Sequence, residues 1–279
     1  MDESLQPLDA EQHRTHGFKV KTGYDFAAGD MLAPVLLAEL SSVMPHYALV
    51  FRKPAETGRY QLNVLLGFKP GGNLFVDARG QWLADCYVPS VYRSYPFVMK
   101  TVRVDGGFRG LVCFDRRSGL YRERPDPQQR EVRFFDDDGH LQPGMKKLVT
   151  LLEKTTRNRE VTQAAVDALA EAQLLVPWEL RAVRGGESPE TVIQGLYRID
   201  EAALNNLEAD ALLDLQRANA LAAAYAQLLS MARIRPLRQK YAAARPPAEQ
   251  QKKMQEPLHD DRGDAGGFSL DDDDMITGS

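Results

Sequence analysis

Residues 73–97 read NLFVDARGQWLADCYVPSVYRSYPF, and this stretch decides how the fold of the chain is interpreted. It interleaves aromatic side chains with prolines and charged residues, a mixture that ordinary core packing does not require. The apolar start suits a half-buried strand, and residues 77–80 are typical of a turn in which Gly80 adopts positive φ. A returning strand over residues 81–83 would complete a β-hairpin. Pro89 then ends that strand, because proline cannot donate a ladder hydrogen bond.

Two interpretations of these aromatic side chains are open. In the first, they fill a core or an interface, since aromatic residues bury large areas and hydrogen-bond through their polar tips. In the second, they form a binding surface in which Arg93, between Tyr92 and Tyr95, clamps an anion or a carboxylate. The candidate ligand-binding residues of the second interpretation are Trp82, Tyr87, Arg93, Tyr95 and Asp77.

The stretch resembles the signature of the SapC family, a bacterial family of about this chain length. Its members typically read LFVD-x-x-G-x-W, then Y-V-P, then R-x-Y-P-F. The corresponding positions are residues 74–77, Gly80, Trp82, residues 87–89 and residues 93–97. Further segments that match in the family's order are Tyr24 with Phe26, then residues 33–39, 47–51, 174–178, 195–200 and 221–230.

The resemblance covers most of the chain, from about Phe18 to Leu237, and implies an association with bacterial surface layers, as the family name indicates. It supplies no catalytic residues to carry over. One departure is Ser94, where family members usually have a second arginine before Tyr-Pro-Phe. A clamp that needs two cations is weakened by this change.

The composition is that of an ordinary soluble protein of 279 residues, 43% hydrophobic and 27% charged. No run approaches the ~18 apolar residues that a membrane-spanning helix needs, and the start of the chain lacks the pattern of a secretory signal. We therefore expect a cytoplasmic protein, with association with the cell envelope as a further possibility. Cys86 and Cys113 are then expected as reduced, buried thiols.

Charge is distributed unevenly along the chain. Residues 1–245 carry 32 Lys+Arg and 30 Asp+Glu, whereas residues 246–279 carry 3 and 9. The near-neutral body gives no indication of nucleic-acid binding, and the composition of the acidic segment predicts a disordered tail. An acidic run between apolar anchors in this tail resembles a linear motif for a basic partner, the alternative being a solubilising tail. The motif consists of Phe268, Leu270, Asp271, Asp272, Asp273, Asp274, Met275 and Ile276.

The order of patterns predicts an α+β fold, with mainly antiparallel sheet in the N-terminal half and packed helices in the C-terminal half. We expect one compact domain over residues 18–245, a flexible arm over residues 1–17 and the disordered tail over residues 246–279. Expected strands cover residues 47–51, 60–68, 97–104, 109–114, 177–183 and 191–199. Expected helices cover residues 31–44, 143–172 and 204–244, the last with a break near Asn219 and a kink or end at Pro236.

The sequence holds no G-x-S-x-G elbow, HExxH motif or P-loop. The favoured function is therefore a non-enzymatic binding or accessory protein that recognises a peptide or protein, without cofactor, metal or nucleic acid. An alternative is an enzyme acting on peptides or amino acids, with or without a metal, and another is an assembly adaptor acting through the acidic tail. The enzyme would use His46 or His140 with Asp77, Asp85 or Asp115. Residues 136–138 with His140 are a candidate metal or acid–base cluster, although Asp and Gly there also favour a turn.

Overall fold

The computed structural model describes residues 4–104, 107–183 and 190–244. All of them belong to the first of two units into which the chain divides, Met1–Ala244. The predicted acidic tail and its motif at residues 268–276 lie in the second unit, Arg245–Ser279, outside the described residues.

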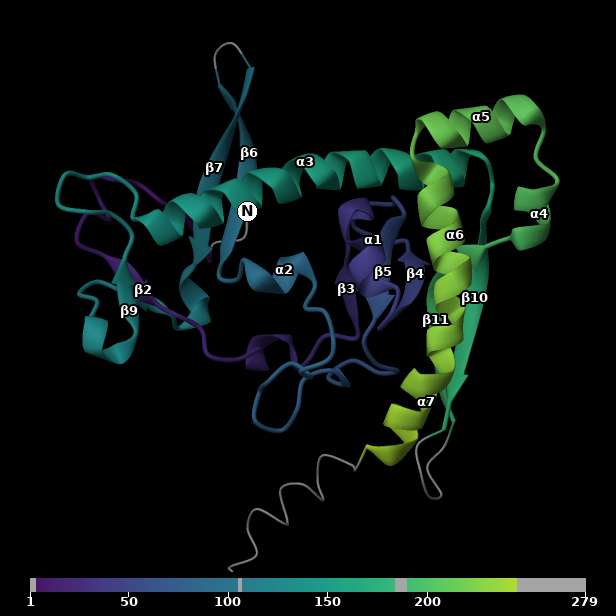
Figure 1. Ribbon diagram of the computed structural model, residues 1–279, viewed down its shortest axis with the longest axis horizontal. Helices are drawn as coiled ribbons and strands as arrows, with labels where there is room; N and C mark the ends of the chain where they lie inside the picture. The colour runs from purple at the N-terminus through teal and green to yellow at the C-terminus, as the bar shows by residue number, and fades with distance from the viewer. Residues whose placement is uncertain (1–3, 105–106, 184–189, 245–279) are drawn as a thin grey trace, which may run out of the picture. The chain divides into compact units, whose positions relative to one another are not determined.

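The α+β class is confirmed, and a five-stranded antiparallel sheet forms its centre (Figure 1). From one edge to the other its strands are β10 (Leu175–Ala182), β11 (Thr191–Ile199), β4 (Ala48–Arg52), β5 (Gln61–Leu65) and β3 (Leu32–Pro34). The central strand β4 is a nearly continuous apolar run and is buried at four of its five positions. Such a run is typical of a strand that is covered on both faces. The C-terminal strand pair β10–β11 joins this sheet by pairing with β4.

Helix α6 (Ala220–Ser230) packs on β4 and β11 and supplies hydrogen bonds where these two strands separate. Their register covers only two residue pairs. Gln227 Oε1 accepts a hydrogen bond from Ile199 N at 2.9 Å, and Ser230 Oγ accepts one from Leu49 N at 2.8 Å. Both polar side chains are buried. These side chains replace ladder hydrogen bonds that the two strands do not make. Without them each buried backbone N–H would lack a partner, at a cost of about 1–3 kcal/mol.

Two smaller sheets surround a second apolar core. One consists of β1 (Leu5–Pro7), β7 (Gly107–Asp115) and β6 (Phe97–Val104), with β7 in the middle. The other consists of β8 (Tyr121–Arg122), β2 (Gly17–Lys19) and β9 (Glu131–Arg133), with β2 in the middle. The buried members of the second core are Phe97, Phe114, Phe134, Phe135, Met145 and Leu152. Its aromatic rings pack in stacked and edge-on pairs, which adds directional contacts to apolar burial.

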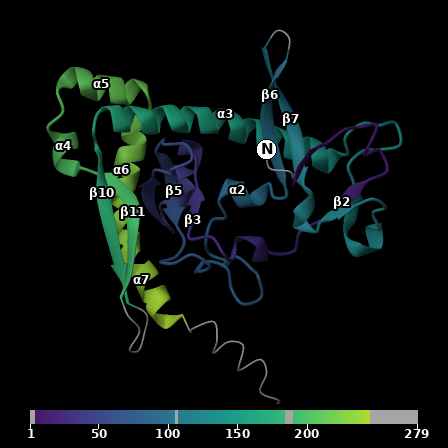
Figure 2. The same cartoon turned by 180° about the vertical axis from the view of Figure 1, so that it is seen from behind.

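The long helix α3 (Pro143–Glu171) contributes to both cores. Met145 and Leu152, in its N-terminal half, belong to the second core, whereas Ala165 and Leu169 belong to the main core. A helix of 29 residues is about 43 Å long at about 1.5 Å per residue. Figures 1 and 2 show it running from α6 to the region of β2. Helix α3 therefore ties the two cores together.

The remaining helices are short. The α-helices are α1 (Leu40–Val43), α2 (Ser90–Arg93), α4 (Glu201–Asn205), α5 (Ala209–Arg217) and α7 (Ile234–Ala243), and the 3₁₀ turns are Asp25–Ala27, Leu37–Glu39, Arg116–Ser118, Pro127–Gln129 and Met231–Arg233. The predicted break is present at Asn219, whose φ of 58° is left-handed. Pro236 lies in the first turn of α7, where a missing N–H is tolerated, instead of ending the helix. Among the described helices, none has the length and hydropathy to cross a membrane.

The N-terminal segment differs from the expected flexible arm. Strand β1 pairs with β7, and His13 is only 2% exposed. The ring of His13 meets those of Phe114 and Phe134 edge-on, and Leu8 packs against the same core. The polar composition of residues 1–17 suggested a flexible arm. It does not reveal the pairing of β1 or the burial of His13, because the partners of both lie more than 100 residues away in sequence.

Two further predictions were wrong in part. The helix expected over residues 31–44 is present only at its C-terminal end, as α1, because the preceding residues form the edge strand β3. An edge strand tolerates Pro34, which has no N–H to donate. The hairpin expected over residues 73–83 is reduced to a single bridge between Val76 and Trp82. The turn is as predicted, and the flanking residues still pair across it, since Asp77 N donates to Gln81 O at 2.8 Å and Leu83 N donates to Phe75 O at 2.9 Å.

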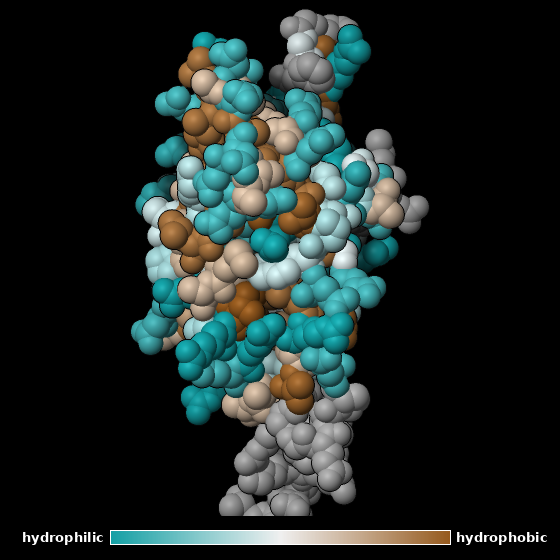
Figure 3. Space-filling view, turned by 90° about the vertical axis from the view of Figure 1, so that its right-hand side faces the viewer, coloured by the Kyte–Doolittle hydropathy of each residue, from teal (hydrophilic) through white to brown (hydrophobic). Residues whose placement is uncertain are grey.

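The helical side of the molecule exposes several apolar residues without forming one continuous patch. Leu212 and Leu213 of α5 and Tyr225 and Leu229 of α6 are exposed. Figure 3 views the side where α4 and α5 lie and shows brown hydrophobic groups separated by hydrophilic ones. Scattered exposed apolar residues are ordinary for a globular surface.

We predict that His13 makes the protein less stable as the pH falls. Burial lowers the pKa of His13 below its ordinary value of 6.5. As the pH falls, His13 is therefore protonated more readily in the unfolded chain than in the folded protein. Its contribution to the free energy of unfolding is complete above pH 6.5 and is lost as the pH falls through the lowered pKa. Urea unfolding across this range should show a weaker pH dependence for His13→Phe than for wild type.

The matched control is His140→Gln, because the side chain of His140 is 73% exposed. This variant should keep the pH dependence of the wild type. An equal pH dependence for His13→Phe and wild type would show that the buried imidazole does not govern acid sensitivity.

Candidate functional site

Glu39 is a buried carboxylate that fastens α2 to the main sheet. Its Oε1 accepts hydrogen bonds from Ser90 N at 2.7 Å and from the Tyr87 hydroxyl at 2.9 Å. Its Oε2 accepts hydrogen bonds from Ser90 Oγ at 2.8 Å and from Leu36 N at 3.2 Å. A buried charge is stable only when such partners replace water. Four donors from two chain segments therefore fix the position of α2.

A second buried network holds Trp82 beneath the same segment. The Trp82 indole N–H donates to the Tyr47 hydroxyl at 2.9 Å, and that hydroxyl donates to the backbone carbonyl of Tyr87. Trp82 is 7% exposed and packs against Phe75 and Tyr92. Trp82 was predicted to contact a ligand, but it lies in the core. Its hydrogen bond to Tyr47 holds the segment that contains Tyr87 in place.

Arg93, at the end of α2, presents a cation at the surface. Its side chain is 42% exposed. Its Nη2 donates to the Tyr87 hydroxyl at 2.7 Å and lies 3.9 Å from Glu39 Oε1, and the guanidinium sits 5.1 Å from the centre of the Tyr87 ring. Burial, followed by the charge of Glu39, raises the pKa of Tyr87 to about 12, so this phenol stays protonated and donates to the carboxylate. The guanidinium is thereby held in one orientation.

Lys21 provides a second cation beside Arg93. Its Nζ donates to the backbone carbonyl of Arg93 at 2.9 Å and to that of Tyr92. The ammonium also lies over the rings of Tyr24 and Phe26, at 5.3 and 5.6 Å from their centres. Burial, followed by the charge of Arg93, lowers the pKa of Lys21 to about 8. The Lys21 ammonium thus reaches the end of α2 from a distant part of the chain.

Of the other two predicted ligand contacts, Tyr95 lies beside this pair and Asp77 lies apart from it. Tyr95 is half-buried and stacks on Phe26 with ring centres 3.9 Å apart, so it extends the aromatic surface next to Lys21. Asp77 is exposed, and its Oδ1 accepts hydrogen bonds from the backbone N–H groups of Arg79 and Gln81. Asp77 therefore forms the turn, and no contact of the described residues joins it to Arg93.

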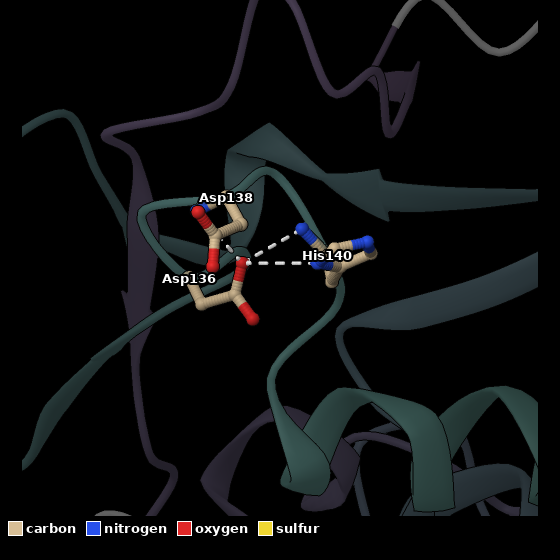
Figure 4. Close-up of side chains that lie close together, drawn as sticks. All are labelled: Asp136, Asp138 and His140. Carbon is tan, nitrogen blue, oxygen red and sulfur yellow. Dashed lines mark hydrogen bonds and ion pairs between the residues drawn. The ribbon is translucent and has the colours of Figure 1, made fainter.

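The predicted acidic cluster does gather at one point (Figure 4). Asp136, Asp138 and His140 each place a ligand atom within 4.8 Å of the others. However, Asp136 Oδ1 accepts hydrogen bonds from the N–H groups of Asp138 and His140 at 3.1 and 2.8 Å. These are the bonds of a turn, and the cluster is largely exposed. The turn alone accounts for the arrangement.

Within the described residues, the enzyme alternative gains no assembled site. His46 makes an edge-on ring contact with Tyr47. Asp115 accepts a hydrogen bond from Arg117 N and caps a short 3₁₀ turn. Neither is joined by a hydrogen bond or ion pair to Asp77 or Asp85 in this part of the chain.

The SapC family model matches residues 8–237. The chain belongs to the SapC family. The resemblance read from residues 73–97 is thereby confirmed, and the match extends beyond the N-terminal limit inferred from the motifs. No curated protein and no solved structure matches this SapC chain.

Two residues of the site were not predicted from the sequence. Glu39 ends one of the family-like segments, residues 33–39, so its place in that pattern was a signal, but it was not singled out as a site residue. Lys21 gave no signal, because it meets Arg93 across 72 residues of sequence. Only the fold shows that these residues share a site.

We predict that Glu39→Gln lowers the free energy of unfolding by about 1–3 kcal/mol. The amide replaces one acceptor oxygen with an NH₂ group that faces donors, and each carboxylate oxygen of Glu39 now accepts two hydrogen bonds. Urea unfolding followed by tryptophan fluorescence measures the change.

Glu153→Gln is the matched control for this substitution. Glu153 is exposed on α3, and within the described residues it has no hydrogen bond or ion pair. It should change the free energy of unfolding by less than about 0.5 kcal/mol. If the two variants are equally stable, the Glu39 network contributes little to the fold.

Proposed function

We propose that this SapC-family protein is a non-enzymatic binding or accessory protein that recognises a peptide or protein segment through Tyr87, Arg93 and Tyr95. The observation that carries the proposal is the exposed guanidinium of Arg93, held over Tyr87 by the buried carboxylate of Glu39. Arginine and tyrosine are the residue types that dominate protein-binding surfaces. A partner in the cell envelope agrees with the surface-layer association in the family name.

Preorganisation supports recognition at this surface. A flexible arginine loses about 0.5–1.5 kcal/mol of side-chain entropy on binding, and stacking on Tyr87 removes part of that loss in advance. Only one hydrogen bond from the Arg93 side chain is made within the described residues, so most of its five N–H donors are left for a ligand. Such a guanidinium can bind a carboxylate through two parallel hydrogen bonds.

Lys21 makes an acidic segment the preferred ligand. The Lys21 ammonium contacts the backbone of Arg93 and is acted on by its charge, and the buried Glu39 that partly balances Arg93 already accepts four hydrogen bonds. Asp30, another acid of this region, accepts a hydrogen bond from the Tyr92 hydroxyl at 2.7 Å. An incoming carboxylate would relieve the repulsion between Lys21 and Arg93. Tyr95 and Phe26 would then line the adjoining apolar contact.

We predict that Arg93→Ala weakens binding to acidic peptides at least about tenfold, the expected effect of losing a charge-assisted pair. Peptides are first selected against the wild-type protein from a displayed random library. Their affinities are then measured by isothermal titration with wild type and variant.

Arg124→Ala serves as the control, because Arg124 is an exposed arginine with no hydrogen bond or ion pair within the described residues. It should leave the affinities unchanged. Peptides that bind Arg93→Ala and wild type equally would place the binding surface elsewhere on the protein.

We further predict that binding of the same peptides weakens as the pH rises through about 8. Lys21 is protonated below its lowered pKa of about 8 and loses its charge above it, so its attraction for a carboxylate disappears there. Titrations on both sides of that pH should show the loss for wild type. Lys21→Met should bind more weakly at neutral pH and show no such step; a step that persists in this variant would assign the titration to another group.

A further inference from the structure

A pocket on the same side of the main sheet as α2 is not used by the surface just described. It has a volume of about 220 Å³ and lies between the end of β3, the start of β5, α2 and the middle of α3. Its apolar walls include Val35, Leu62, Val91 and Val166. A cavity of about 150 Å³ admits a benzene ring. This pocket therefore has room for one aliphatic side chain and a small polar group.

Most polar groups at the pocket are already satisfied. Thr162 Oγ1 accepts a hydrogen bond from Leu37 N at 2.9 Å and donates to Asn158 O at 2.7 Å. Gln163 Nε2 donates to Tyr60 O at 3.0 Å and to Asp167 Oδ1 at 2.9 Å. These side chains form part of the pocket wall, and their hydrogen bonds are made within the protein.

Two polar side chains at the pocket have no partner within the described residues. They are Arg159, an exposed cation on α3, and Gln61, half-buried at the start of β5. Two acids behind this wall are already engaged, since Glu39 accepts hydrogen bonds from Ser90 and Asp167 accepts one from Gln163. The pocket thus combines an uncompensated guanidinium and a free amide with apolar walls.

We propose that this pocket binds the C-terminal residue of a peptide, with its free carboxylate on Arg159 and its aliphatic side chain against Val91 and Leu62. A single guanidinium matches the geometry and the charge of one carboxylate. A doubly charged phosphate would leave charge unbalanced close to the Glu39 carboxylate. The amide of Gln61 can accept the last peptide N–H.

The chemistry of the pocket favours a chain end over an internal acidic residue. A C-terminal aliphatic residue carries its carboxylate and its apolar side chain on the same carbon, which matches the juxtaposition of Arg159 and the apolar walls. An internal aspartate or glutamate brings a carboxylate without that neighbouring apolar group. The site goes beyond the proposed function, since it uses different residues from the Arg93 surface.

The test uses the full-length protein and a fluorescein-labelled glycyl-alanyl-alanyl-leucine peptide. The peptide is made as the free acid, as the C-terminal amide and as the free acid with serine in place of leucine. Fluorescence polarisation should show the leucine acid binding about tenfold more tightly than either other peptide, because each lacks one of the two interactions.

Variants then locate the site. Arg159→Ala should bind the acid and the amide of the leucine peptide equally. Thr155→Phe, a substitution at a half-buried wall position of α3, should fill the pocket and weaken binding of the acid. Arg157→Ala is the matched control, since Arg157 is an exposed arginine two residues away that does not line the pocket. Arg93→Ala should also bind like wild type.

Several outcomes would overturn the proposal. These are equal binding of acid and amide by wild type, no saturable binding of the acid at millimolar peptide, or an equal loss in Arg157→Ala and Arg159→Ala. A loss in Arg93→Ala with full binding by Arg159→Ala would assign the carboxylate to the Arg93 surface instead. Retained binding in Arg93→Ala leaves this site standing even where the proposed function fails.

Discussion

A carboxylate removed from water must find other donors, and in this protein that requirement determines how the family signature is arranged. Glu39 is 5% exposed and is held by four hydrogen bonds, three of them from Tyr87 and Ser90. Breaking such an arrangement leaves a buried charge without partners, which is far more costly than losing an exposed ion pair. The position of α2 therefore depends on Glu39. The orientation of Arg93 and the wall of the pocket beside Ser90 depend on it in turn.

The aromatic stretch combines the two interpretations that its sequence allowed. Trp82 and Tyr92 are buried, with their polar atoms bonded to Tyr47 and Asp30. Tyr87 bridges the two environments, because its hydroxyl joins the buried Glu39 to the exposed Arg93. Core packing and surface recognition are thus functions of different residues in one segment, and the core residues give the surface residues their fixed geometry.

The site also lies where the two cores of the fold come together. Lys21 follows β2, a strand of the smaller sheets, and its ammonium binds the carbonyl end of α2, which Glu39 fastens to the main sheet. Helix α3 joins the same two regions and supplies Arg159 to the pocket. Contacts between separately packed regions are common places for binding sites, since neither region covers them alone.

The class of fold, the family and the long elements could all be predicted from local sequence patterns. Helix α3 and strands β4, β6, β7, β10 and β11 follow from local patterns of apolar residues, which depend only on the period of the element. Such patterns could not determine the packing of His13, the strand at residues 32–34 or the meeting of Lys21 with Arg93. Those depend on contacts between distant segments. Only the tertiary structure decided that Trp82 lies inside and Arg93 outside, because burial is set by what packs over a side chain and not by its neighbours in sequence.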